Sequence, residues 1–294
     1  MQLLRAICER AGHTPAGVAA VLCACLVVSR VGCVAAANRE PTSDLVLVHL
    51  TDLHCATRTQ NPEAKILFDP HVKDLVHSFQ WLQAAVRDIN RNVRPDTVVV
   101  TGDLVDKGRD VDDLRKVRRI LDGLSCPYYP VPGDHDSRKA FRDVFDRPPS
   151  YAFTCGPWRF IALDASSGAV SRESLTLLRE ELGDLAEPRA AVLVHRPLVM
   201  GPVEIAAARL FYGVRLRARN ADRVLEMLDG HPRVRLVLAG HCHHNTECQR
   251  GDAVHLTTGC LIEPGHAYRV LRLRGREIRS ALREVRLDAQ AQQR

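Results

Sequence analysis

Five apolar runs in this 294-residue chain each lead into a short motif that contains aspartate or histidine. The runs span residues 45–50, 97–101, 126–131, 190–194 and 234–239. Runs of this length and apolar character are typical of buried β-strands. Because ligands gather beyond the carboxyl ends of strands in open α/β sheets, we expect the five motifs to converge on one site.

Helical spacing of apolar residues between these runs predicts helices at 72–92, 110–121, 171–182 and 221–228. Helices that alternate with strands indicate an α/β fold with a largely parallel or mixed sheet, covered on its faces. Further strands are expected at 158–163, 253–258, 268–273 and 277–285, the last three of them antiparallel. Residues 198–220 show no clear period and are expected to form a long excursion over the active face.

The composition is that of a globular protein. Hydrophobic residues make up 46% of the chain and charged residues 26%, which argues against global disorder and allows one domain over residues 45–287. The net charge of +6 lies mostly in the last third of the chain, without interleaved aromatic residues. We therefore expect a solvated basic face that suits a small anionic substrate, and no nucleic-acid polymer as a partner.

The N-terminal residues 1–37 are typical of a secretory leader. Arg5 and Arg10 precede an apolar stretch at 16–28, and small alanines follow at 35–37. Arg30 interrupts this pattern, so a lipidated or uncleaved anchor with membrane association is a second interpretation, and an unstructured extension a third. We expect an exported or membrane-anchored protein, with residues 38–44 as a linker and 288–294 as a tail.

Cysteine usage gives no metal-binding pair. Four of the ten cysteines lie in the leader, and the other six contain no C-x-x-C spacing, which argues against a zinc knuckle. Disulfides in an exported protein and buried free thiols are both compatible with these six residues.

The five motifs together supply a set of metal-ligating side chains, although each motif alone is more often a turn or a structural residue. The members are Asp52, His54, Asp103, Asp134, His195, His241 and His243. These seven ligands serve two four-coordinate positions if one carboxylate is shared. Mixed carboxylate and imidazole ligation suits manganese, iron or zinc. Two such ions about 3.5–4 Å apart can hold a bridging hydroxide and clamp the oxygens of a phosphoryl transfer.

The last motif, Gly240-His241-Cys242-His243, makes a geometric prediction. Two histidines separated by one residue on an extended segment point in different directions, so each is expected to serve a different metal. Gly240 would let the backbone approach the cluster, and Cys242 is expected to be packed and not to bind metal.

The ordered motifs resemble those of the calcineurin-like metallophosphoesterase superfamily, D-x-H, G-D, G-N-H-D/E, H and G-H-x-H. The chain has Asp52-Leu53-His54, Gly102-Asp103, Gly133-Asp134-His135-Asp136, His195 and Gly240-His241-Cys242-His243. The resemblance spans residues 45–275. Residues 102–106 and 219–221 are most similar to the bacterial cyclic-nucleotide phosphodiesterase branch.

This resemblance implies a four-layer α/β/β/α sandwich of two mixed sheets, with a dinuclear metal site at the carboxyl ends of the strands. One metal would be held by Asp52, His54, Asp103 and His243, and the other by Asp103, Asp134, His195 and His241. His135 would protonate the leaving oxygen or stabilise the transition state, with Asp136 orienting its ring. Arg196 and Asn220 are the candidate substrate contacts.

Two residues depart from the family pattern. Asp134 stands where the family usually has asparagine, and Arg196 where it often has a second histidine. A third carboxylate makes the site less positive, which would favour a phosphodiester monoanion over a monoester dianion. Arg196 could partly compensate for this charge as a phosphate contact.

The resulting hypothesis is a metal-dependent hydrolase of phosphodiesters such as cyclic nucleotides. A phosphomonoesterase or a pyrophosphatase acting on lipid- or nucleotide-linked substrates is the first alternative. A metal-binding scaffold with little turnover is the second, for which Asp134 is the only support. The oligomeric state and the identity of the metals stay open.

Overall fold

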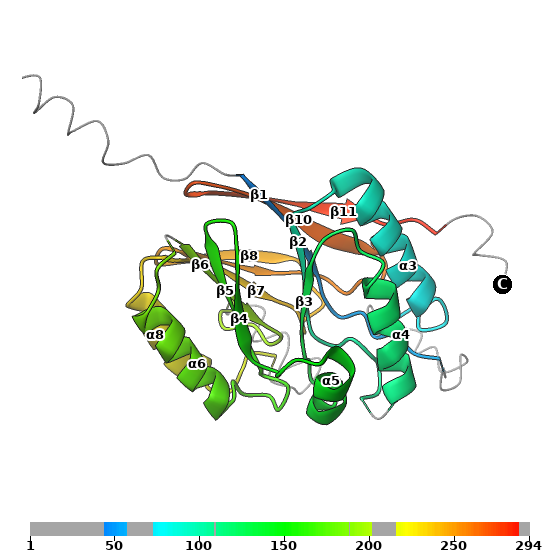
Figure 1. The fold of residues 1–294 in the computed structure, drawn as a ribbon, viewed down its shortest axis with the longest axis horizontal. Helices are drawn as coiled ribbons and strands as arrows, with labels where there is room; N and C mark the ends of the chain where they lie inside the picture. The colour runs from blue at the N-terminus through cyan, green and yellow to red at the C-terminus, as the bar shows by residue number, and fades with distance from the viewer. Residues whose placement is uncertain (1–43, 58–72, 109, 188, 202–215, 288–294) are drawn as a thin grey trace, which may run out of the picture. The chain divides into compact units, whose positions relative to one another are not determined.

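Two β-sheets form the centre of the fold in the computed structural model, which describes residues 44–57, 73–108, 110–187, 189–201 and 216–287 (Figure 1). The first sheet has the strand order β11-β10-β1-β2-β3, with β1 (Leu45–Leu50), β2 (Thr97–Thr101), β3 (Tyr128–Val131), β10 (Ala267–Arg274) and β11 (Glu277–Glu284). The second has the order β4-β5-β6-β7-β9-β8, with β4 (Tyr151–Cys155), β5 (Trp158–Leu163), β6 (Arg189–Val194), β7 (Val234–Ala239), β8 (Thr246–Arg250) and β9 (Ala253–Thr257).

Helices cover the outer face of each sheet. The first sheet carries α3 (Ser78–Asp88), its π-helical extension η1 (Ile89–Val93), α4 (Val111–Leu121) and α5 (Arg138–Phe145) (Figure 1). The second sheet carries α6 (Arg172–Gly183) and α8 (Ala221–Asp229). Polar side chains begin three of these helices, since Asp110, Ser137 and Ser171 each accept a hydrogen bond from a backbone N–H in the first turn. The predicted four-layer sandwich is confirmed.

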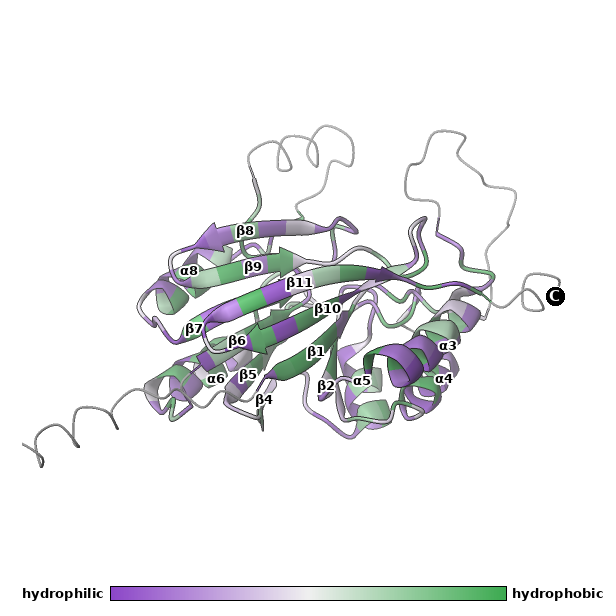
Figure 2. Cartoon of the chain, turned by 90° about the horizontal axis from the view of Figure 1, so that it is seen from above, coloured by the Kyte–Doolittle hydropathy of each residue, from purple (hydrophilic) through white to green (hydrophobic). Residues whose placement is uncertain are grey.

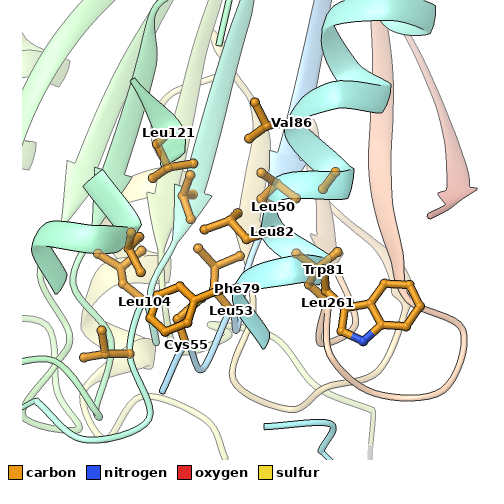
Figure 3. Close-up of a cluster of buried hydrophobic side chains, with 14 of the residues drawn as sticks. Leu50, Leu53, Cys55, Phe79, Trp81, Leu82, Val86, Leu104, Leu121 and Leu261 are labelled. Carbon is orange, nitrogen blue, oxygen red and sulfur yellow. The ribbon is translucent and has the colours of Figure 1, made fainter. Parts of the chain in front are cut away.

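Alternation along the central strands divides the core into layers. In the first sheet Leu47 and Val99 point between the sheets, whereas Val48 and Val98 pack under the helices. Figure 3 shows the helix-facing layer, where Leu50 of β1 lies close to Leu82 of α3. Because both faces of β1 and β2 are buried, these strands contain nearly continuous apolar sequence.

The second sheet follows the same rule. Leu236 and Leu238 of β7 face the other sheet, and Val237 and Ala239 face α6 and α8. The edge strand β8 is different, because its residues are half-buried or exposed, and it is mostly polar in Figure 2. This polarity explains why β8 was not predicted.

Several boundaries and connections differ from the prediction. The segment 253–258 forms β9, which is parallel to β7 and antiparallel only to β8, whereas β10 and β11 form an antiparallel hairpin in the first sheet. Strand β4 and the eight-residue helix α5 were also not predicted, because each is too short for a clear period. The helix expected at 72–92 begins at Ser78.

The leader (1–37), nearly all of the linker (38–44) and the tail (288–294) lie outside the described residues, as does 202–215 within the expected excursion. Their predictions therefore stay predictions. In the part of the chain that the structure describes, no helix has the length and apolar character needed to cross a bilayer.

Candidate metal centre

The five motifs meet where the carboxyl ends of the central strands of both sheets face each other. The first sheet contributes the segments after β1, β2 and β3, and the second sheet those after β6 and β7. Two close approaches join the sheets at this point. Oδ1 of Asp103 lies 3.3 Å from Nε2 of His195, and Oδ1 of Asp52 lies 3.4 Å from Nε2 of His243.

Six of the seven predicted ligands fall into two groups, and Asp134 belongs to neither. Asp52, His54, Asp103 and His243 bring one potential ligand atom each to within 4.8 Å of one another, and Asp103, His195 and His241 form the second group. His241 and His243 thus belong to different groups, as predicted, although the predicted extended segment is not formed, because both residues have positive φ angles. The donor atoms that could hold two cations lie on either side of one shared residue.

Asp103 is the shared residue, and its two oxygens face different histidines. Oδ2 lies 3.5 Å from Nε2 of His54, and Oδ1 lies 3.3 Å from Nε2 of His195. The backbone N–H of His135 also donates to Oδ1 at 2.9 Å, which fixes the orientation of the carboxylate. A carboxylate held between two donor groups in this way has the geometry of a bridging ligand.

The backbone is strained at most of these ligands. Asp52, His54, Asp103, His241 and His243 all have positive φ angles, between 40° and 69°. Such conformations cost roughly 1–3 kcal/mol each for residues other than glycine, and they cluster at functional sites. The strained residues lie at the strand ends, where the chain turns sharply and brings their side chains together.

Glycine is required beside the cluster because no space is left for a side chain. A Cβ on Gly240 would lie 1.9 Å from Oγ1 of Thr51 and 2.4 Å from Oδ2 of Asp52. One on Gly133 would lie 2.2 Å from the backbone nitrogen of Asp103. The close approach predicted for Gly240 is confirmed, and it lets the N–H of His241 donate to the Asp52 carboxylate.

The electrostatics of the cluster favour positive charge on two of its four histidines, whereas burial lowers the pKa values of His54 and His241. Burial alone would lower the pKa of His195, but the Asp103 carboxylate beside it raises that pKa to about 10. Burial likewise opposes a charge on His243, and Asp52 raises its pKa to about 9. The buried carboxylates therefore stabilise positive charge on these two histidines, which are protonated when no other cation is bound.

His195 shows most directly that the cluster fits metal ions. Its Nδ1 donates to the carbonyl oxygen of Thr101 at 2.8 Å, which leaves Nε2 as the potential ligand atom. Nε2 is fully buried and makes no hydrogen bond of good geometry. A buried imidazole nitrogen without a hydrogen-bond partner, beside a shared carboxylate, can give its lone pair to a metal ion. The residues therefore fit two divalent ions.

His135 lies at the open side of the cluster and is 41% exposed. Its Nε2 lies 4.0 Å from Oδ2 of Asp103, while its Nδ1 donates to the carbonyl oxygen of Asp106 at 2.7 Å. The prediction that Asp136 orients this ring is therefore wrong, because the Asp106 backbone holds it.

Asp136 instead fastens two motifs together. Its buried carboxylate accepts hydrogen bonds from the backbone N–H groups of Leu104, Val105 and Gly133. These bonds join the turn after β3 to the segment after β2. Burial and the nearby Asp103 charge raise the pKa of Asp136 to about 7.

Arg196 and Asp134, the two departures from the family pattern, form an ion pair. Nε of Arg196 donates to Oδ1 of Asp134 at 3.1 Å, and Nη2 donates to Oδ2. The guanidinium charge offsets the extra carboxylate, which removes the charge argument for a diester preference. Asp134 still lies beside the second ligand group, 4.0 Å from both Nε2 of His195 and Nδ1 of His241.

Asn220, the other candidate substrate contact, joins two backbone segments. Its amide oxygen accepts from the N–H of Val170, and its amide nitrogen donates to the carbonyl of the same residue, both at 2.9 Å. These bonds give Asn220 a structural role, and a substrate contact stays a prediction.

Three residues of the site were missed by sequence reasoning. Oδ1 of Asp106 lies 3.5 Å from Nδ1 of His54, Nζ of Lys73 lies 3.1 Å from Nε2 of the same histidine, and Glu263 contacts Nδ1 of His243. Asp106 follows Asp103 by three residues, so its position was a usable signal. Lys73 and Glu263 carry no motif, and only the tertiary structure brings them to the cluster.

The six cysteines that follow the linker are all free thiols. Cys242 is buried and lies in neither ligand group that contains its neighbouring histidines, as predicted. Cys260 is closer to the first ligand group, since its Sγ lies within 4.8 Å of a ring nitrogen of His54 and of His243. Its thiol lies 3.0 Å from the carbonyl oxygen of Asp52, and burial raises its pKa, so it is an inert thiol here.

Comparison with known proteins agrees with this arrangement. The family Metallophos, calcineurin-like phosphoesterase, matches residues 45–245, more than half of the chain. A probable cyclic nucleotide phosphodiesterase from Synechococcus sp. is 26% identical over 207 residues, which cover 68% of this chain and 73% of that protein. A cAMP/cGMP dual specificity phosphodiesterase from Mycobacterium tuberculosis is 29% identical over 226 residues, or 71% and 65% of the two chains. A glycerophosphodiester phosphodiesterase from Enterobacter lignolyticus is 26% identical over 227 residues, or 71% and 74%.

Solved structures share the fold. A dimetal phosphatase from Danio rerio superposes with a TM-score of 0.60 at 20% identity, covering 82% of this chain and 99% of that one. A purple acid phosphatase from yellow lupin has a TM-score of 0.60 at 12% identity, covering 83% and 52%. At these identities the likeness establishes the fold, an architecture of two sheets.

Proposed function

Because the chain belongs to the calcineurin-like phosphoesterase family, we propose that it hydrolyses phosphodiesters, cyclic nucleotides among them, with two divalent cations. The observation that carries this proposal is the position of Asp103 between two groups of ligand atoms. The choice of diesters is supported by three relatives whose names describe phosphodiesterases of cyclic nucleotides or glycerophosphodiesters.

The ligand groups assign the cations to residues of both sheets. Asp52, His54, Asp103 and His243 would hold one, and Asp103, His195 and His241 the other, with Asp134 as the candidate fourth ligand. Manganese, iron and zinc suit this mixture of carboxylates and imidazoles. Two such ions supply charge neutralisation of the phosphate oxygens and a lowered pKa for water.

His135 is placed to handle the proton of the leaving group. Because Nδ1 donates to the Asp106 carbonyl, the other ring nitrogen, Nε2, faces the cluster. An imidazolium at this position can give its Nε2 proton to the alkoxide as its bond to phosphorus breaks, while water supplies the new oxygen on phosphorus. The products are an alcohol and a phosphomonoester, which for a cyclic nucleotide belong to one molecule.

The neighbours of His135 leave room for a substrate. His135 and Asp136 lie in the lining of an open cavity of about 710 Å³ with Gly108, Arg115 and Lys139. Both basic side chains are paired with aspartates, Arg115 with Asp112 and Lys139 with Asp143, so the support for this side comes from the exposed ring of His135. We infer that the substrate reaches the cluster from this side.

Metal reconstitution followed by a substrate panel tests the proposed function. Protein stripped with EDTA would be loaded with Mn²⁺, Zn²⁺ or Fe²⁺. Each form would be assayed with bis-nitrophenyl phosphate, nitrophenyl phosphate, 3′,5′-cyclic AMP, glycerophosphodiesters and a nucleotide diphosphate sugar. We expect turnover only in the loaded forms, with diesters hydrolysed faster than the monoester.

Asp103→Asn is the matched variant for this panel, because it keeps the shape of the shared ligand and removes its charge. It should lose metal and turnover together. Full activity in excess EDTA, or a monoester turned over faster than every diester, would contradict the proposed function.

A further inference from the structure

Asp134 and Arg196 are bound to each other by both carboxylate oxygens. Nε of Arg196 donates to Oδ1 at 3.1 Å, and Nη2 donates to Oδ2. The side chains are 19% and 15% exposed, so the pair is largely shielded from water. Two parallel charge-assisted bonds of this kind are among the strong interactions between side chains, and they fix the plane of the carboxylate.

The same two oxygens face the second ligand group. Oδ1 of Asp134 lies 4.0 Å from Nε2 of His195, and Oδ2 lies 4.0 Å from Nδ1 of His241. A carboxylate binds a metal ion through oxygen lone pairs, and both oxygens already accept from the guanidinium. A cation bound with His195 and His241 must therefore compete with Arg196 for Asp134.

The first ligand group has different partners. The carboxylate of Asp52 accepts from the hydroxyl of Thr51 and from the N–H of His241, and Nζ of Lys73 lies 3.1 Å from Nε2 of His54. The neutral donors orient the Asp52 carboxylate without adding a positive charge, and the Lys73 ammonium contacts an imidazole nitrogen. The ion pair at the second position thus differs in kind, because it holds a carboxylate by both of its oxygens.

We propose that Arg196 is a positioning residue that, by pairing with Asp134, makes the second cation position weaker than the first. This inference rests on the proposed function, because it presupposes that the cluster binds two cations. It also explains why both departures from the family pattern occur in one chain. A carboxylate in place of an amide adds a negative charge, and the arginine that neutralises it holds that carboxylate by both oxygens.

Titration of the EDTA-stripped full chain with Mn²⁺ tests this inference without an activity assay. Calorimetry gives the two affinities, and electron paramagnetic resonance distinguishes a single Mn²⁺ from a coupled pair. In the wild type we expect two unequal sites. Arg196→Ala should tighten the second site about 10- to 100-fold, the strength of a hydrogen-bonded charge pair, and leave the first within about threefold.

Arg196→Lys separates the bidentate pairing from charge alone. Lysine keeps the positive charge but cannot donate through a planar fork, so it should tighten the second site less than alanine does. Arg250→Ala is the matched control, because Arg250 makes the same two-bonded pair with Asp229 on the surface. It should leave both Mn²⁺ affinities unchanged.

A double-mutant cycle shows whether Arg196 acts through Asp134. In an Asp134→Asn background, Arg196→Ala should change the second affinity by less than about threefold, because the carboxylate is gone. The inference is overturned if the full gain persists in that background, or if Arg196→Ala weakens the second site or leaves it unchanged. Those outcomes would leave the proposed function standing. A wild type that binds no Mn²⁺ would instead overturn both the proposed function and this inference.

Discussion

Nδ1 of His243 is hydrogen-bonded to the carboxylate of Glu263, which is itself buried and lies between β9 and β10. In the neutral imidazole this bond places the proton on Nδ1 and leaves the lone pair on Nε2. That nitrogen lies 3.4 Å from Oδ1 of Asp52, inside the first ligand group. Glu263 therefore sets the tautomer in which His243 can bind a metal ion.

Glu263→Gln should weaken metal binding at the first position. A glutamine can still contact Nδ1, but it lacks the charge that increases the basicity of the ring. We expect a loss of about 10- to 100-fold in Mn²⁺ affinity, measured by calorimetry. Glu277→Gln on β11 is the control, because Glu277 lies on the surface and pairs with Arg279. An unchanged first affinity in Glu263→Gln would show that the bond has no effect on the ligand.

Gly240→Ala should destabilise the fold even without metal. The added Cβ would lie 1.9 Å from Oγ1 of Thr51, so the strand end must move. We expect the free energy of unfolding in urea with EDTA to fall by about 1–3 kcal/mol. Gly183→Ala at the end of α6 has no atom within 4 Å of its Cβ, so its stability should stay the same or rise by up to about 1 kcal/mol. Equal stability of the two variants would rule out the steric argument.

His135→Ala should reduce turnover and leave metal binding intact. Loss of a general acid typically costs about 10²- to 10⁴-fold in kcat. The loss should be larger for a cyclic nucleotide, with its poor alkoxide leaving group, than for a nitrophenyl diester, whose leaving group needs no proton. His231→Ala, outside the ligand groups, is the control. The same loss for both substrates would show that His135 has another role.

His49→Gln should make stability less sensitive to acid. His49 is fully buried, and burial together with the charge of Arg269 lowers its pKa from 6.5 to about 3. Between these values the unfolded chain binds a proton that the folded protein does not, so stability is lost as the pH falls. From pH 7.5 to pH 4.5 this single group should remove about 2–3 kcal/mol in the wild type.

Urea unfolding in EDTA at both pH values measures this effect as a difference between two proteins. Glutamine can keep the contact to the hydroxyl of Thr101, which Nε2 of His49 makes at 2.7 Å. The other acid-sensitive groups are common to both proteins and cancel. The wild type should therefore lose about 2–3 kcal/mol more than the variant, and equal losses would falsify the assignment of a buried, neutral His49.

The amino-acid sequence by itself determined the central strands and placed the candidate ligands shortly after them. Strands such as 45–50 and 97–101 appear at the predicted residues, because buried strands need apolar side chains on both faces. The candidate metal ligands lie close behind such strands, and parallel strands in one sheet end at the same edge. The distribution of His241 and His243 over two groups was also predicted, but for the wrong reason, because both residues have a left-handed backbone and the segment is not extended.

Only the tertiary structure decided the partners of these ligands. Asp134 and Arg196 are 62 residues apart, and Glu263 reaches His243 across 20 residues without a motif. The direction of β9 and the position of the polar edge strand β8 were likewise set by pairing between strands. Such contacts depend on the register and order of whole strands. A local pattern records which side chains a strand end carries, but not which distant backbone brings a counter-charge to meet them.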